Sequence, residues 1–237
     1  MNDSSHAQQD ALHTGRKGAG GAILFSEMRP EAAWEDEFNA WYDTEHIPVR
    51  MAAPGFIGAR RYRATESDDY LVVYEMASMA ALATPEYDRI KNQPSELTRR
   101  MLGGVHGFTR YLGETSAVAG GAQAGALDAP LLFAAMFDVP PAELADFDAW
   151  YEQDHVPLLL ECSDWLMVRR FHLTAGEPRP FNRLALHYLA SVEALSSPAR
   201  AKARETPWRE RMAGRDWFGK GRYAVFRRVG RTQSATR

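Results

Sequence analysis

The stretch that decides the fold is Phe38-Asn39-Ala40-Trp41-Tyr42-Asp43-Thr44-Glu45-His46-Ile47-Pro48, because it occurs a second time as Phe147-Asp148-Ala149-Trp150-Tyr151-Glu152-Gln153-Asp154-His155-Val156-Pro157. The offset of 109 residues, measured from Trp41 to Trp150, continues without a gap through Arg60-Arg61-Tyr62, which return as Arg169-Arg170-Phe171. Upstream, Ile23-Leu24-Phe25 matches Leu131-Leu132-Phe133 at an offset of 108 residues. A repeat of this length exceeds the usual period of solenoid proteins, so the sequence predicts two copies of one small domain.

Each copy carries the pattern of four strands and two helices. In the first copy we expect strands at 22–28, 56–63, 70–76 and 105–112 and helices at 30–47 and 77–101. In the second copy we expect strands at 131–137, 165–172, 183–189 and 221–229 and helices at 141–155 and 191–213. Pro48 is expected to end the first helix near His46. Both copies are therefore β-α-β-β-α-β, the ferredoxin-like arrangement.

The domain organisation follows from this pattern. The fold class is α+β: two tandem ferredoxin-like halves pack sheet against sheet and form an eight-stranded α+β barrel within one chain. A central space between the sheets would be a ligand site. The expected boundaries are a flexible tail at 1–21, the first half at 22–113, a Gly/Ala-rich linker at 114–130, the second half at 131–229 and a tail at 230–237.

The composition argues against several classes of function. Hydrophobic residues make up 45% of the 237 residues and charged residues 25%, which is typical of globular domains. No apolar run approaches the ~20 residues that cross a bilayer, and residues 1–21 lack the apolar core of a signal peptide. The single cysteine, Cys162, suits a reducing compartment. We therefore expect a cytoplasmic protein without a membrane partner.

Basic and aromatic residues are concentrated in the C-terminal third. The cations are Lys202, Arg204, Arg209, Arg211, Arg215, Lys220, Arg222, Arg227 and Arg228. Such a run is typical of single-stranded nucleic-acid binding, whereas the alternative is an amphipathic helix and a strand with the cations on the solvent side. Acidic residues interrupt the run, the formal net charge is −3, and no nucleic-acid motif is present. We therefore expect no nucleic-acid partner.

The repeated motif resembles a known family. Trp-Tyr-x-x-Glu/Asp-His-Ile/Val-Pro, followed on the next strand by Arg-Arg-Tyr/Phe, is similar to the EthD-like branch of the dimeric α/β-barrel superfamily, and the resemblance covers both halves. That superfamily includes polyketide cyclases, lactone isomerases, cofactor-free oxygenases, haem-degrading enzymes and stress proteins. The resemblance implies the fold, but function is decided by the site.

One acidic residue in each motif lies on the apolar face of the helix. On a helical wheel at about 100° per residue, Glu45 falls along the stripe of Trp34, Phe38 and Trp41, and Asp154 has the same place in the second copy. A carboxylate there needs a cation. We therefore expect structural ion pairs in which Glu45 and Asp154 bind a strand arginine of their own half, drawn from Arg60, Arg61, Arg169 and Arg170.

A histidine follows each of these acids. His46 and His155 have a reference pKa near neutrality and lie beside Tyr42 and Tyr151, so they can act as general base or acid. The alternative is a helix C-cap. We expect one histidine to line the reaction cavity and the other to cap its helix. The loop after His46 is small and carries Arg50 for an anionic group, which favours His46 as the catalytic residue.

No metal or organic cofactor is expected. Asp43-x-x-His46 and Glu152-x-x-His155 have the i, i+3 spacing of di-metal carboxylate proteins. Those sites lie inside helical bundles, whereas the two helices here are expected on opposite outer faces of a barrel. His-Glu-x-x-His, Cys-x-x-Cys and phosphate-binding glycine loops are missing from the sequence.

The sequence thus predicts a cofactor-independent enzyme that acts on a small aromatic or lactone-like molecule. A histidine would abstract a proton, and Arg60 with Tyr62, or Arg169, would hold the oxyanion, with Trp165 as a further substrate contact. This supports lyase, isomerase or cyclase chemistry. The alternative is a non-catalytic small-ligand-binding or stress-response protein, and a homodimer is left open. If neither motif histidine is the base, strand residues His106, His172 and His187 are the next candidates.

Overall fold

The computed structural model describes residues 19–123 and 125–235, and within them eight antiparallel strands form one closed barrel. The order around the barrel is β1-β3-β2-β8-β5-β7-β6-β4. The strands are β1 (Ala22–Arg29), β2 (Phe56–Ala64), β3 (Tyr70–Met76), β4 (His106–Gly120), β5 (Leu131–Phe137), β6 (Trp165–Glu177), β7 (Arg183–Leu189) and β8 (Arg222–Ser234). The predicted α+β barrel of two ferredoxin-like halves is therefore confirmed.

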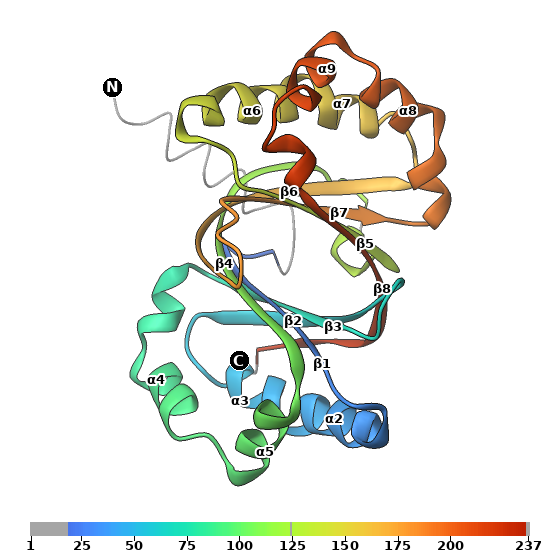
Figure 1. Cartoon of the computed structure of the whole chain (residues 1–237). Coiled ribbons are helices and arrows are strands. Elements are labelled where there is room, and N and C mark those ends of the chain that lie inside the picture. The colour runs from blue at the N-terminus through green and yellow to red at the C-terminus, as the bar shows by residue number, and fades with distance from the viewer. Residues whose placement is uncertain (1–18, 124, 236–237) are drawn as a thin grey trace.

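The helices form two layers at opposite ends of the molecule, with the barrel between them (Figure 1). They are α2 (Glu35–Trp41), α3 (Ile47–Met51), α4 (Pro85–Asn92), α5 (Glu96–Gly104), α6 (Leu144–Trp150), α7 (Val156–Leu159), α8 (Pro198–Arg204) and α9 (Pro207–Ala213). Short 3-10 turns add Ala32–Trp34, Met79–Ala83, Ala126–Asp128, Pro141–Glu143, Val192–Ser196 and Phe218–Lys220. Each layer covers the outer face of the sheet of its own half.

Two long strands close the barrel across the halves. β4 continues to Gly120 and pairs with β6, while β8 continues to Ser234 and pairs with β2. The start of the expected linker at 114–130 and most of the expected tail at 230–237 are therefore strand. The backbone groups of these two segments form hydrogen bonds with strands of the other half. Each half had been predicted separately from the sequence, so this pairing was not expected.

The expected N-terminal tail also differs. Residues 1–18 lie outside the described part of the chain, but Gly20 is buried, and its backbone N–H donates to the Glu75 carboxylate at 2.9 Å. A side chain there would place its Cβ 2.1 Å from the carbonyl oxygen of Met76. Glycine is therefore required where this segment crosses the end of β3.

The pleat assigns each strand residue to the barrel interior or to a helical layer. Ile23 and Phe25 pack inside the barrel together with Leu132, whereas Leu24 packs under the helices of the first half and Leu131 under those of the second. The expected match of Ile23 with Leu131 would join residues on opposite faces. The correct offset upstream is therefore 109, the same as in the motif, because a one-residue slip turns every side chain of a strand over.

The barrel interior is packed rather than hollow. Its apolar cluster includes Phe25, Tyr62, Phe171 and Phe226, each at most 1% exposed. The central space that was expected to hold a ligand is thus occupied by side chains from both sheets.

The first helix of each half does not end at its histidine. After α2 the backbone makes a π-helical turn, Tyr42–His46, in which the N–H of Ile47 donates to the carbonyl of Tyr42, and α3 follows. Tyr151–His155 repeats this turn before α7. Pro48 is tolerated because it falls in the first turn of α3, where a missing N–H costs little. The inserted residue turns each later side chain back by about 100°.

Candidate functional site in the second half

The predicted site residues lie on two different faces of the sheet. Tyr42 and His46 pack under the first helical layer, and Tyr151 and His155 under the second. Arg60, Tyr62 and Arg169 lie instead within the barrel interior or along its wall. The predicted combination of a motif histidine with these residues as an oxyanion clamp is therefore wrong, because the sheet separates them. The clamp was assigned without knowing which strand face is interior.

The interior arginines make structural contacts. The Arg169 guanidinium, 0% exposed, donates to the Glu75 carboxylate and, at 3.1 Å, to the carbonyl oxygen of Gly20. This pair joins β6 of one half to β3 of the other. Arg60 binds Asp128 at 3.0 Å and so fastens the turn before β5. Arg60 and Arg169 therefore hold the two halves together.

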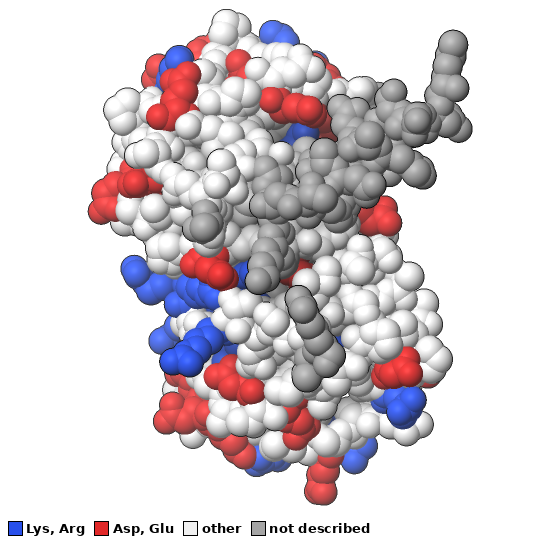
Figure 2. All heavy atoms as spheres, turned by 180° about the vertical axis from the view of Figure 1, so that it is seen from behind, with Lys and Arg blue, Asp and Glu red and all other residues white. Residues whose placement is uncertain are grey.

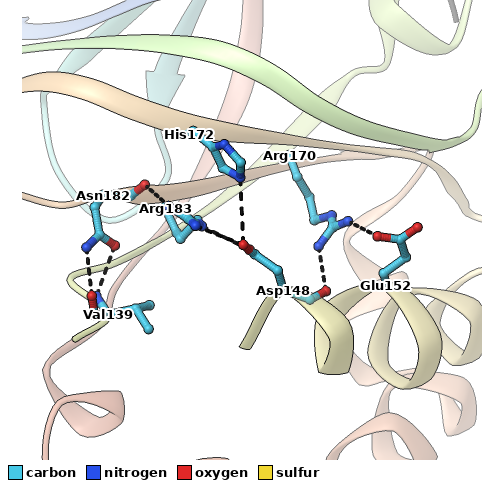
Figure 3. A network of polar contacts seen from close by, with 7 residues as sticks. All are labelled: Val139, Asp148, Glu152, Arg170, His172, Asn182 and Arg183. Atoms are coloured by element: carbon cyan, nitrogen blue, oxygen red, sulfur yellow. Dashed lines mark hydrogen bonds and ion pairs between the residues drawn. The ribbon is translucent and has the colours of Figure 1, made fainter. Parts of the chain in front are cut away.

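The ion pairs expected at Glu45 and Asp154 are wrong by two positions. Arg61 bonds to Asp43 at 3.1 Å and Arg170 to Glu152 at 2.8 Å. Figure 3 shows Arg170 of β6 reaching both Glu152 and the backbone of Asp148 on the helix. The π-helical turn moves Glu45 and Asp154 off the apolar stripe. The acids two residues earlier, Asp43 and Glu152, therefore face the strand arginines.

Glu45 and Asp154 have another role. Glu45 accepts hydrogen bonds from the hydroxyls of Ser95 and Thr98, and Asp154 accepts one from Thr206 at 2.6 Å. These hydrogen bonds, those of Ser95 first, lower the pKa of Glu45. Because Ser95 and Thr206 are the N-caps of α5 and α9, each acid fastens the two helices of its half together.

The second helical layer encloses a cavity of about 350 Å³ against the outer face of its sheet. Its walls are aromatic, aliphatic and basic, and none of the described residues that line it is acidic. The lining residues are Phe133, Ala135, Phe137, Trp150, Tyr151, His155, Leu159, Trp165, Arg200, Arg204, Arg209, Phe218 and Tyr223. Of the predicted site residues, His155, Tyr151 and Trp165 are brought together here.

A buried hydrogen-bond chain orients Tyr151 at this cavity. The indole Nε1–H of Trp165 donates to Nδ1 of His187 at 3.1 Å, and Nε2 of His187 lies 2.9 Å from the Tyr151 hydroxyl. Indole is only a donor, so Nδ1 must accept and the proton of neutral His187 must lie on Nε2. Burial lowers the pKa of His187 well below its ordinary value, which agrees with this neutral form.

The Tyr151 oxygen therefore accepts from His187, and its own proton has no acceptor among the described residues. Burial raises the pKa of Tyr151, so the phenol stays protonated and acts as a donor. His187 was only a secondary candidate from the sequence, and its function here is to orient Tyr151.

His155 presents a basic nitrogen to the same cavity. Its Nδ1 lies 3.2 Å from the carbonyl oxygen of Ala203 on α8. A carbonyl only accepts, so Nδ1 carries the proton and Nε2 carries a lone pair, for which the described residues offer no donor. Burial, opposed by the bond to Ala203 and assisted by the charge of Arg209, lowers the pKa of His155 to about 4. His155 is therefore neutral at pH 7.

Three arginines of the cavity were not assigned to a site from the sequence. Arg200 and Arg204 are four residues apart on one face of α8, and Arg209 lies in the first turn of α9. Arg204 and Arg209 belong to the C-terminal cations that were expected on the solvent side. The signal in the sequence was that Arg200 and Arg204 are four residues apart, which places them on one face of a helix, with no acid at the same spacing to pair with them.

The equivalent region of the first half is different. His46 is 4% exposed, and its Nδ1 has no partner among the described residues. Tyr42 donates to the sulfur of Met28 at 3.4 Å. Arg50 donates to the carbonyl of His46 and lies over the ring of Tyr74. His46 borders a wider groove of about 650 Å³, which also contains the acids Glu45 and Glu86.

The structure bears on only some of the predictions about metals and partners. Among residues 19–123 and 125–235, no group of three or more His, Cys, Asp or Glu is placed to hold a metal ion, and no helix is long and apolar enough to cross a membrane. On the face shown in Figure 2, basic side chains gather in one patch near mid-height, and acidic side chains are scattered above and below it. The expected lack of a cofactor and of a nucleic-acid partner, the cytoplasmic location and the homodimer stay predictions.

Three solved structures illustrate what the chain is similar to. An anthrone oxidase-like protein superimposes with a TM-score of 0.65 and 10% identity over 91% of this chain and 94% of that one. A monooxygenase-like protein from Fusobacterium nucleatum subsp. nucleatum superimposes with a TM-score of 0.61 and 12% identity, over 91% of this chain and 95% of that one. A mutant of chlorite dismutase from Candidatus Nitrospira defluvii superimposes with a TM-score of 0.54 and 10% identity, over 94% of this chain and 95% of that one. No protein-family model and no curated protein matches the sequence.

Superposition at such low sequence identity establishes the fold alone, and the reaction has to be argued from the residues of the site. The coverage is nearly complete in both directions, so the likeness includes both halves and the closure between them. The chain therefore has the α+β barrel fold of these structures, with both halves of the barrel in one polypeptide.

Proposed function

We propose that the protein is a cofactor-independent enzyme that moves a proton on a small aromatic molecule bound in the second-half cavity. His155 is the general base, and Tyr151 donates a hydrogen bond to the oxygen that becomes negative. The observation that carries this proposal is the presence, at one aromatic cavity, of a histidine Nε2 and a phenol proton that no described residue engages.

The chemistry follows from these two atoms. Nε2 of His155 takes a proton from a phenol or a carbon acid, while the bond from Nδ1 to Ala203 keeps the ring in the required tautomer. A base with a pKa of about 4 is weak, so the site must also lower the pKa of the substrate group that gives up its proton. Tyr151 and the cations of the cavity do this by stabilising the developing negative charge in a partly dry environment.

Isomerisation, cyclisation and carbon–carbon bond cleavage all begin with this proton transfer, which is why the site supports a lyase, an isomerase or a cyclase. The names of two similar structures, anthrone oxidase-like and monooxygenase-like, add molecular oxygen as a second reactant to test. In that case the carbanion left by deprotonation would form a carbon–oxygen bond to O₂, and the peroxide so formed would take the proton back from His155 as a hydroperoxide.

The alternative is a non-catalytic binding protein. Such a protein needs an apolar cavity alone, whereas an enzyme needs a titratable group that a polar partner orients. His155 is oriented by Ala203, and Tyr151 by His187 and Trp165, so two reactive groups each have such a partner. This arrangement supports an enzyme over a binding protein.

The test is hydrogen exchange at acidic positions of candidate substrates. A panel of phenolic, fused-ring and lactone-like compounds is incubated with the protein in heavy water, and mass spectrometry records deuterium uptake and new products. Oxygen consumption in the same samples separates an oxygenase from an isomerase or lyase. We expect exchange or product with wild type and with His46→Ala, and a large loss with His155→Ala. Binding without exchange or product across the panel would instead identify a binding protein.

A further inference from the structure

We propose that the second-half cavity recognises an aromatic carboxylate, whose acid group is held by Arg200, Arg204 and Arg209. This inference rests on the function proposed above for the same site and names the class of its ligand. Two features of the cavity support it: arginines without an acidic partner among the described residues, and a buried indole N–H without an acceptor there. Together they give the cavity more donors than acceptors.

The three arginines lack the acidic partners that other arginines of this chain have. Arg61 and Arg170 each bind a carboxylate, whereas no described acid lies within ion-pair distance of Arg200, Arg204 or Arg209. All three guanidinium groups are charged at neutral pH. Such a cluster repels itself, and an anionic ligand would relieve that repulsion.

The arginines are also held in place at the cavity. Nη1 of Arg200 donates to the carbonyl of Leu195 at 2.6 Å, and the guanidinium of Arg209 lies 4.4 Å from the ring centre of Phe218. Burial and the charge of Arg204 lower the pKa of both Arg200 and Arg209. Arg204 is exposed and the other two are half-buried, so the cluster extends from the mouth of the cavity inward.

A comparison of the two halves identifies the unpaired indole. In the first half, Nε1–H of Trp41 donates to Thr98 at 3.0 Å, three residues after the N-cap of α5. The equivalent position on α9, three residues after its N-cap, is Arg209, which cannot accept a hydrogen bond. Trp150 is 1% exposed and lines the cavity, and its buried Nε1–H has no partner among the described residues. An acceptor on the ligand would satisfy this donor once the side chains that cover Nε1 move aside.

The polar groups of the cavity are nearly all donors. Three guanidinium groups, the indole of Trp150 and the hydroxyl of Tyr151 donate, the hydroxyl of Tyr223 can donate or accept, and Nε2 of His155 accepts. The ligand must therefore present several acceptor oxygens beside an apolar body that fits the aromatic walls. A carboxylate on a ring system meets both requirements, and about 350 Å³ is at the small end of ligand pockets, which suits one or two rings.

The experiment compares probes of equal shape and different charge. The probes are 2-naphthoate, naphthalene-2-sulfonate and neutral naphthalene-2-carboxamide, and binding to the full chain is measured by calorimetry. We expect 2-naphthoate to bind at least about tenfold more tightly than the carboxamide, with an affinity that falls as salt rises. Equal affinity for the acid and the amide would overturn the proposal, and tighter binding of the sulfonate would replace carboxylate by sulfonate as the group recognised.

Charge-removing variants locate the binding site. Arg200→Gln, Arg204→Gln and Arg209→Gln should each weaken 2-naphthoate about tenfold and leave the carboxamide unchanged. The matched controls are Lys202→Gln on α8 and Arg211→Gln on α9, which remove the same charge from the same helices at exposed positions outside the cavity. Equal losses in the controls would mean general attraction without a site, which contradicts the proposal.

The indole gives a readout that needs no variant of the arginines. In protein labelled with ¹⁵N-tryptophan, the Nε1–H signal of Trp150, assigned with Trp150→Phe, should move downfield with 2-naphthoate and much less with the carboxamide. An unmoved signal at saturating 2-naphthoate would place the carboxylate elsewhere.

His155→Ala separates this inference from the proposed function. We expect that variant to lose exchange or turnover and to keep its preference for 2-naphthoate. If wild type prefers the acid but His155→Ala has no effect on turnover, the proposed base is wrong and the anion site stands. If turnover depends on His155 but no probe shows a charge preference, the anion site is wrong and the base stands.

Discussion

The two halves share their backbone and differ in what fills the space between helices and sheet. In the first half Tyr74, Tyr87 and Arg50 occupy positions that correspond to His187, Arg200 and Leu159 in the second. Tyr87 stacks on Phe56, and Arg50 lies over Tyr74, and the space left beside His46 is the wider groove that Glu45 and Glu86 also line. In the second half Arg200 and Leu159 line a smaller cavity beside His155, which no described acid lines.

The comparison teaches which parts of a duplicated motif are structural. The arginine tie, the acid that binds the N-cap hydroxyl and the π-helical turn are present in both copies. Both copies also keep the histidine, yet its surroundings differ. The proposed reaction therefore depends on the residues around the motif as well as on the motif itself.

The largest expected effect is on turnover. His155→Ala should lower the rate of the proposed reaction by ~10²–10⁴-fold, because it removes the general base. His46→Ala is the matched change in the first half and should leave the rate within about twofold of wild type. Initial rates on a substrate found in the exchange screen, with far-ultraviolet circular dichroism as the check on folding, measure this. A greater loss in His46→Ala would move the active site to the first half, where the sequence alone had placed it.

The next effect is on the link between the halves. Glu75→Ala leaves the Arg169 cation buried without its partner and should lower the free energy of unfolding by ~3–5 kcal/mol. Glu152→Ala breaks the more exposed tie to Arg170 within the second half and should cost at most ~1 kcal/mol. Urea unfolding of both variants compares the two pairs. A similar cost for both would mean that Arg169 finds another partner or reaches water.

A smaller effect concerns pH. Burial lowers the pKa of His155 to about 4 from an ordinary 6.5, so the folded protein resists a proton that the unfolded chain accepts. The stability that this group contributes is complete above pH 6.5 and is lost as pH falls toward about 4, with ~3 kcal/mol as the upper magnitude. The pKa values of His46 and His187 are lowered in the same direction.

Urea unfolding at pH 7.5 and pH 5 measures this slope, and His155→Gln is the control because glutamine does not titrate. We expect a shallower slope in the variant. Parallel slopes in wild type and variant would show that His155 is not protected from protonation in the folded state.

The smallest effect tests the paired and unpaired indoles. Thr98→Val removes the acceptor of Trp41 and should destabilise the first half by about 1 kcal/mol. Arg209→Thr supplies Trp150 with the hydroxyl that the first half has, and it should raise stability while weakening carboxylate binding. Thermal melts with and without 2-naphthoate measure both. Destabilisation by Arg209→Thr would mean that Arg209 serves packing over Phe218 rather than a ligand.

Several site residues could be predicted and others could not. His155, Tyr151 and Trp165 were named because the repeat and its polar helix end stand out in the sequence. His187 was named only as one of three strand histidines, since nothing local ties it to Tyr151, 36 residues away. Arg200, Arg204 and Arg209 were seen as part of a basic run, but their helices come after the motif, and the sequence does not say which side of them meets it.

The sequence by itself determined the duplication, the order of elements, the eight-stranded barrel and the use of a strand arginine to tie each first helix to its sheet. These features depend on repeats and on hydrophobic periods that a few neighbouring residues display. Tertiary structure alone decided which strand face is interior, which acid meets each arginine, and which side chains line the space beside each histidine. The physical reason is that a single inserted residue turns a helix by about 100° and a single-residue slip inverts a strand, so such differences are settled by contacts between distant segments.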